Sequence, residues 1–73
     1  MKKTAADLTI EKLIDNGWRI SHNSLVSHYC FAGSVTPMKT RNGKEYCRVH
    51  HGKSIKGRYQ ITTVMERQEG VKA

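Results

Sequence analysis

The sequence predicts one small α+β domain, in which two N-terminal helices are followed by a β-hairpin and a third strand. Two observations support this fold class. Apolar residues recur at helical spacing between residues 5 and 16, and again after residue 21. Further on, side chains alternate in character on both sides of Asn42-Gly43, a dipeptide suited to a type I′ turn because both of its residues tolerate positive φ. The chain of 73 residues makes a single domain, 1–73, near the lower size limit for a self-sufficient core.

The first predicted helix covers residues 5–16. Thr4 is a good N-cap, and Asp7 three residues later allows a capping box. The apolar residues that follow fall on one helical face: Ala6, Ile10, Leu13, Ile14 and Gly17. Asn16-Gly17 favours a left-handed stop. We expect Trp18 to fill the joint behind this helix rather than to stack on a ligand.

The second predicted helix begins at Ser21, a candidate N-cap, and ends at Ala32-Gly33. Its apolar residues follow the spacing i, i+1, i+4, i+5: Leu25, Val26, Tyr29 and Cys30. The polar residues left on the outer face are His22, Asn23, Ser27 and His28.

The predicted hairpin, residues 35–49, has two contrasting faces if Asn42-Gly43 is the turn. Arg41 then lies opposite Lys44, and Met38 opposite Cys47. Alternation gives a mostly apolar face made of Thr36, Met38, Thr40, Glu45, Cys47 and Val49. The other face is cationic with one aromatic ring, and consists of Lys39, Arg41, Lys44, Tyr46 and Arg48. Such a hairpin suits a position between a core and a polyanion.

The C-terminal part is predicted to be a glycine-bounded basic loop over residues 50–57, then a third strand over 58–65 that is rich in β-branched residues. A helix remains the alternative there, because Ile61, Val64 and Met65 also fit helical spacing. Residues 1–3 and 67–73 are expected to form flexible tails.

The charge is concentrated in one half of the chain. The formal net charge is +7; residues 1–33 carry four Lys or Arg and three acids, whereas residues 34–73 carry nine Lys or Arg and three acids. This distribution indicates a surface that binds phosphates or another anionic partner. No apolar run approaches the ~20 residues that span a bilayer, and no signal-peptide pattern follows the start. We therefore expect a cytoplasmic protein, no membrane partner and reduced cysteines.

The order helix, connector, polar helix, basic hairpin and strand resembles the layout of a small winged helix-turn-helix. The runs LTIEKLIDNG, ISHNSLVSHY and NGKEYCRV are similar to excisionases and small regulators of temperate phages. The resemblance implies a DNA-binding protein of the transcription-regulator or excisionase type, in which the second helix approaches the major groove and the hairpin acts as a wing. It also implies a homodimer or cooperative binding on double-stranded DNA.

The expected DNA-binding residues come from the polar helix, the wing and the basic loop. They are His22, Asn23, Ser27, His28, Lys39, Arg41, Lys44, Tyr46, Arg48, Lys53, Lys56 and Arg58. The basic members would contact phosphates. Two alternatives stay open: an RNA- or single-strand-binding module that uses Tyr46 for stacking, and a basic adaptor or inhibitor that docks on an acidic protein.

Metal binding and catalysis are less favoured by the sequence. A zinc set of His28, Cys30, Cys47 and His50 has one unusual spacing, and the hairpin register predicts that Cys47 is a buried thiol. We accordingly expect no cofactor. An enzyme is not expected either, because 73 residues leave little room for a substrate cavity.

Overall fold

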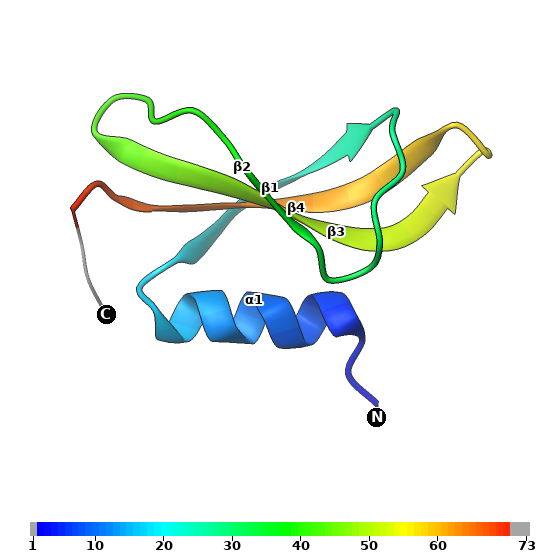
Figure 1. Ribbon diagram of the computed structural model, residues 1–73, viewed down its shortest axis with the longest axis horizontal. Helices are drawn as coiled ribbons and strands as arrows, with labels where there is room; N and C mark the ends of the chain where they lie inside the picture. The colour runs from blue at the N-terminus through cyan, green and yellow to red at the C-terminus, as the bar shows by residue number, and fades with distance from the viewer. Residues whose placement is uncertain (1, 71–73) are drawn as a thin grey trace.

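The computed structural model describes residues 2–70 and has one helix packed on one face of a four-stranded antiparallel sheet (Figure 1). The elements are α1 (Ala5–Asp15), β1 (Arg19–Val26), β2 (Val35–Pro37), β3 (Lys44–Ile55) and β4 (Tyr59–Gln68). The strands are ordered β1-β4-β3-β2 across the sheet. The predicted winged-helix-like arrangement of two helices before a hairpin is therefore wrong, because the described chain has one helix and is mostly β.

Helix α1 confirms the first predicted helix. The Thr4 hydroxyl accepts a hydrogen bond from the Asp7 backbone N–H, and an Asp7 carboxylate oxygen accepts one from the Thr4 N–H, each at 3.1 Å. This capping box satisfies two backbone donors that the first helical turn leaves without a partner. The helix has 11 residues, and no helix within residues 2–70 is long and apolar enough to cross a membrane.

The predicted second helix is instead strand β1. Seven of its residues pair with β4, from Arg19 opposite Glu66 to Val26 opposite Gln60, with a bulge at Ser21. The sequence RISHNSLV is poor in strong helix formers, and its Ser and Asn residues offer a helix little support. Pairing with the β-branched run of β4 gives these residues a backbone partner that local spacing could not indicate.

The predicted turn at Asn42-Gly43 is confirmed, but the predicted register beyond it is wrong. Asn42 and Gly43 have φ of 54° and 76°, and Arg41 and Lys44 exchange both backbone hydrogen bonds. Farther from the turn, Pro37 pairs with Cys47, the residue predicted to face Met38. Hydrogen-bonded and non-hydrogen-bonded pairs alternate in an antiparallel ladder, so the predicted register would place Pro37 where an N–H is needed. The one-residue shift within residues 38–40 removes that requirement.

Strand β4 confirms the predicted third strand, and the helical alternative is wrong. Its extent differs from the prediction, because β4 includes Arg67 and Gln68, which were expected in the tail. The basic loop expected over residues 50–57 is also wrong: β3 continues to Ile55 through an irregularity between His50 and Ser54, and a tight turn at Lys56-Gly57 follows. The expected tail residues 1 and 71–73 lie outside the described residues.

The two faces of the sheet differ because only one is covered by α1 (Figure 1). On this helix face, Cys47, Val49 and Met65 are buried against Ala6. The partly buried residues packed around them are Ile10, Leu13 and Trp18, so the expected packing role of Trp18 is confirmed. We call the other side the open face; strand alternation places on it Arg19, His22, Lys44, Tyr46, Arg48, Val64 and Glu66.

Candidate nucleic-acid interface

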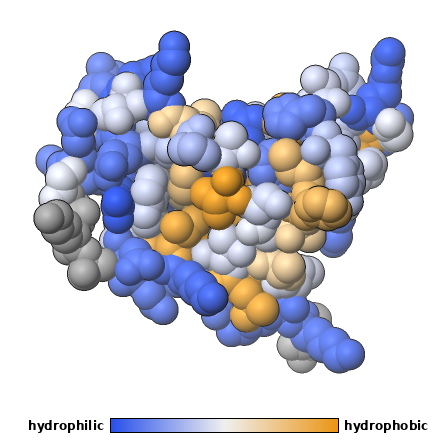
Figure 2. All heavy atoms as spheres, viewed as in Figure 1, coloured by the Kyte–Doolittle hydropathy of each residue, from blue (hydrophilic) through white to orange (hydrophobic). Residues whose placement is uncertain are grey.

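A pocket of about 390 Å³ lies on the open face, at the end of the sheet near the Asn42-Gly43 turn. We call it the basic pocket; its lining residues are His22, Met38, Lys39, Arg41, Tyr46 and Val64. Figure 2 shows that the outline of the molecule is hollowed on the side away from α1, with hydrophilic residues projecting at both ends of the hollow.

Several elements position the residues of the basic pocket. Tyr46 and Val64 come from the two central strands, β3 and β4, and Val64 is only 1% exposed. His22 reaches this face because the bulge at Ser21 resets the alternation of β1. Lys39 and Arg41 come from the irregular segment after Pro37 and are exposed. The pocket therefore combines an apolar and aromatic floor with a cationic rim.

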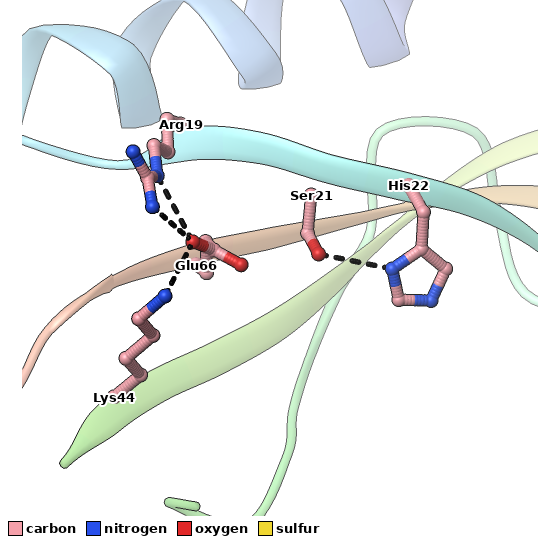
Figure 3. Close-up of polar contacts among 5 residues, drawn as sticks. All are labelled: Arg19, Ser21, His22, Lys44 and Glu66. Carbon is pink, nitrogen blue, oxygen red and sulfur yellow. Dashed lines mark hydrogen bonds and ion pairs between the residues drawn. The ribbon is translucent and has the colours of Figure 1, made fainter. Parts of the chain in front are cut away.

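Glu66 is the acidic residue of the open face, and its charge is compensated (Figure 3). One carboxylate oxygen, Oε2, lies 2.7 Å from Nη2 of Arg19 and 3.3 Å from Nζ of Lys44. The hydrogen bond from Arg19, with the one from Lys44 adding to it, lowers the pKa of Glu66. Glu66 thus carries its negative charge between two cations and does not neutralise the basic pocket.

Three cations of the open face are left without such a partner. Lys39, Arg41 and Arg48 form no ion pair within the described part of the chain. Three of the six acidic residues, Asp7, Glu11 and Asp15, lie instead on α1, on the other side of the sheet. The protein therefore has a cationic sheet face opposite a more acidic helix.

The structure brings together some of the residues predicted to bind DNA. His22, Lys39, Arg41 and Tyr46 share the basic pocket. Lys44 and Arg48 flank Tyr46 two residues away on β3 and point to the same face, because side chains alternate along a strand.

Other predicted residues lie elsewhere. Asn23 is on the helix face, where its Oδ1 accepts a hydrogen bond from the Thr63 hydroxyl at 3.0 Å. Ser27 and His28 belong to the connection between β1 and β2. The remaining basic residues, Lys53, Lys56 and Arg58, lie at or next to the opposite hairpin turn.

Sequence reasoning missed several residues of this surface. Met38 was expected on the apolar face of the hairpin, and Val64 was assigned no site role, yet both line the basic pocket. Arg19 and Glu66 were not recognised as an ion pair, because they are 47 positions apart in sequence. The alternation in residues 58–65 could have shown which face of the strand carries Val64. It does not specify which strands lie beside this one, so the pocket could not be predicted from it.

The candidate zinc set is divided between the two faces. Cys47 is 4% exposed on the helix face, where burial raises the pKa of its thiol to about 11, so the predicted buried thiol is confirmed. His28, Cys30 and His50 instead gather on the other side, with one candidate ligand atom from each lying within 4.8 Å of the others.

Comparison of the chain with protein-family models, curated proteins and solved structures gives no match. The resemblance to phage excisionases and regulators and the absence of enzymatic activity therefore stay predictions.

Proposed function

We propose that this protein binds single-stranded nucleic acid on the open face of its sheet, with one base held in the basic pocket. The observation that carries the proposal is that Tyr46 lines one pocket together with the cations Lys39 and Arg41. Aromatic rings stack on bases of any sequence, and nearby Lys and Arg side chains attract the phosphates that flank the base.

The size and the polarity of the pocket suit a nucleotide. Its volume of about 390 Å³ falls within the range of small-molecule sites. Met38 offers an apolar contact for the face of a base above the buried Val64. His22 supplies the ring nitrogen Nε2, because its Nδ1 lies 2.9 Å from the Ser21 hydroxyl (Figure 3). Arg48, two residues along β3 from Tyr46, adds a cation about 7 Å further along the same strand. This arrangement extends the positive surface beyond a single phosphate.

A single strand fits this surface better than a double helix. The segment expected to form a helix in the major groove is strand β1, so the recognition helix that the winged-helix mode of binding requires is missing from this segment. A base within a duplex presents its edges to a protein, whereas an unstacked base can also present its flat face to an aromatic ring.

The proposal is tested by fluorescence anisotropy with labelled oligouridine, oligothymidine and a mixed-sequence duplex, titrated at several salt concentrations. We expect the single strands to bind more tightly than the duplex. Tyr46→Ala should weaken binding about 10- to 100-fold, because stacking contributes about 1–3 kcal/mol per base. Tyr46→Phe keeps the ring and should retain most of the affinity.

The cations are tested by salt dependence. Arg41→Ala should weaken binding and reduce the slope of log K against log salt by about 0.7, the value for one phosphate contact with a single strand. Lys12→Ala is the matched control, because Lys12 is a cation on α1, on the other side of the sheet. Tighter binding to the duplex would overturn the single-strand proposal. Absence of binding at low salt would overturn any nucleic-acid function and favour an acidic protein partner.

A further inference from the structure

A second cluster of side chains lies apart from the basic pocket, where the connection between β1 and β2, residues 27–34, meets β3. His28 and Cys30 come from this connection, and His50 comes from β3. One candidate ligand atom from each residue lies within 4.8 Å of the other two. The rings of His28 and His50 meet edge to face, with centroids 5.8 Å apart.

His50 has a buried nitrogen that the protein does not satisfy. Its side chain is fully buried, yet Nδ1 has no hydrogen-bond partner. The other ring nitrogen, Nε2, lies 2.9 Å from the Thr36 hydroxyl. If Nε2 carries the proton and donates it to Thr36, Nδ1 presents a free lone pair. Metal-bound histidines usually have this arrangement, in which the second nitrogen is fixed by a hydrogen bond.

Buried polar atoms without partners are uncommon in folded proteins, because burial removes their hydrogen bonds to water and nothing replaces them. The unpartnered Nδ1 of His50 therefore indicates that a further ligand belongs beside it, and His28 and Cys30 are the neighbouring side chains that could share one.

We infer that His28, Cys30 and His50 form a zinc site with three protein ligands and a fourth position for water. Two imidazoles and a thiolate are ligands that zinc favours over calcium or magnesium. Tetrahedral zinc with Zn–N near 2.0 Å and Zn–S near 2.3 Å requires N···S separations of about 3.6 Å. Since the ligand atoms lie within 4.8 Å of one another, they must approach by up to about 1 Å, and the exposed His28 can contribute by rotating its side chain.

The backbone around the cluster already holds two of the ligands in place. The backbone N–H of Cys30 donates to Oε1 of Gln60 on β4 at 3.0 Å. His50 exchanges backbone hydrogen bonds with the connection, through Gly33 at 2.7 Å and Ser34 at 2.9 Å. Bound zinc would fasten the connection to both central strands, and zinc binding would stabilise a domain whose core is small.

The test uses cobalt(II) as a spectroscopic probe of the full chain, followed by displacement with zinc. We expect one equivalent of cobalt to produce tetrahedral d–d bands and a thiolate-to-cobalt charge-transfer band, both of which zinc abolishes. Zinc should also raise the midpoint of thermal unfolding. Absence of a charge-transfer band in folded protein would overturn the inference.

Single substitutions identify the ligands. Cys30→Ser should remove the charge-transfer band. His28→Ala should weaken zinc binding at least about 100-fold, because changing a residue that only hydrogen-bonds to a ligand already costs up to that factor.

The matched controls are Cys47→Ala and His51→Ala, which alter a thiol and an imidazole on the helix face. Both controls should keep the charge-transfer band. Loss of the band in folded Cys47→Ala, or its persistence in Cys30→Ser, would assign the metal elsewhere and overturn this site. If His28→Ala is unfolded, the loss of the band in folded Cys30→Ser decides the question.

Discussion

The guanidinium of Arg67 lies over the ring of Trp18, with its central carbon 4.6 Å from the ring centroid. The same side chain donates from Nε to a Glu45 carboxylate oxygen at 2.7 Å and from Nη1 to the Asn16 carbonyl at 3.2 Å. Arg67 was expected in a flexible tail. It instead connects the end of β4 to the segment between α1 and β1, where Trp18 packs against the core.

Substitution of Arg67 is therefore expected to destabilise the fold. Arg67→Ala should lower the free energy of unfolding by about 1–2 kcal/mol, because it removes a cation–π contact and a partly exposed ion pair. The stability of Arg67→Lys should lie between those of Arg67→Ala and the unsubstituted protein, since Lys keeps the charge but loses the planar guanidinium. Urea unfolding followed by Trp fluorescence measures the effect. Equal unfolding midpoints for Arg67→Ala and the unsubstituted protein would show that the contact contributes nothing.

Glu66 makes the stability of the protein sensitive to acid. Because its cationic partners lower its pKa in the folded state, the unfolded state binds more protons below the ordinary pKa of 4.5. Its contribution is present above pH 4.5 and is lost as the pH falls through the lower, folded-state value. Glu66→Gln should be less stable than the unsubstituted protein at pH 7 and should lose less stability between pH 5 and the acid range. Urea unfolding across this pH series tests the prediction, and parallel curves for the two proteins would contradict it.

Two glycines with positive φ provide a matched test of backbone strain and steric contact. Gly43, with φ of 76°, has open space around it, whereas a Cβ on Gly52, with φ of 71°, would lie 2.8 Å from the Cβ of Ala32. Gly43→Ala should cost about 1–2 kcal/mol from the left-handed conformation alone. Gly52→Ala should cost a further 1–3 kcal/mol or so because it overpacks the contact with the connection. Urea unfolding ranks the variants, and Ala32→Gly should recover part of the Gly52→Ala loss. A cost for Gly43→Ala as large as that for Gly52→Ala would contradict the role of the contact.

The correct sequence predictions depend on residues close together in the chain. The capping box joins Thr4 to Asp7, the hairpin turn is set by Asn42-Gly43, and the alternation of β4 lies within one short run. Each is a local preference of the backbone. Spacing within a few residues was therefore enough to predict α1, the turn and β4.

The wrong predictions depend on contacts between distant parts of the chain. Strand β1 forms because Arg19 to Val26 pair with β4, about forty positions away, and no spacing within β1 encodes that partner. The hairpin register was predicted by counting residues from the turn. It is shifted by one because Pro37 has no N–H for the ladder position that this count assigned to it. The basic pocket could be predicted in part, since Lys39, Arg41 and Tyr46 are near neighbours in sequence, whereas Val64 and His22 required the correct strand order.

The burial of Cys47 makes its thiol resistant to modification in the folded protein. Burial raises its pKa from the ordinary 9.0 to about 11, so little thiolate forms at pH 8. In a Cys30→Ala background, a disulfide reagent should therefore react with Cys47 slowly, and urea should accelerate the reaction as the core opens. The neutral thiol is favoured by the fold, so the stability that it contributes is present below pH 9.0 and is lost as the pH rises toward 11. Reaction at the rate of a small free thiol in the folded protein at pH 8 would show that Cys47 is accessible.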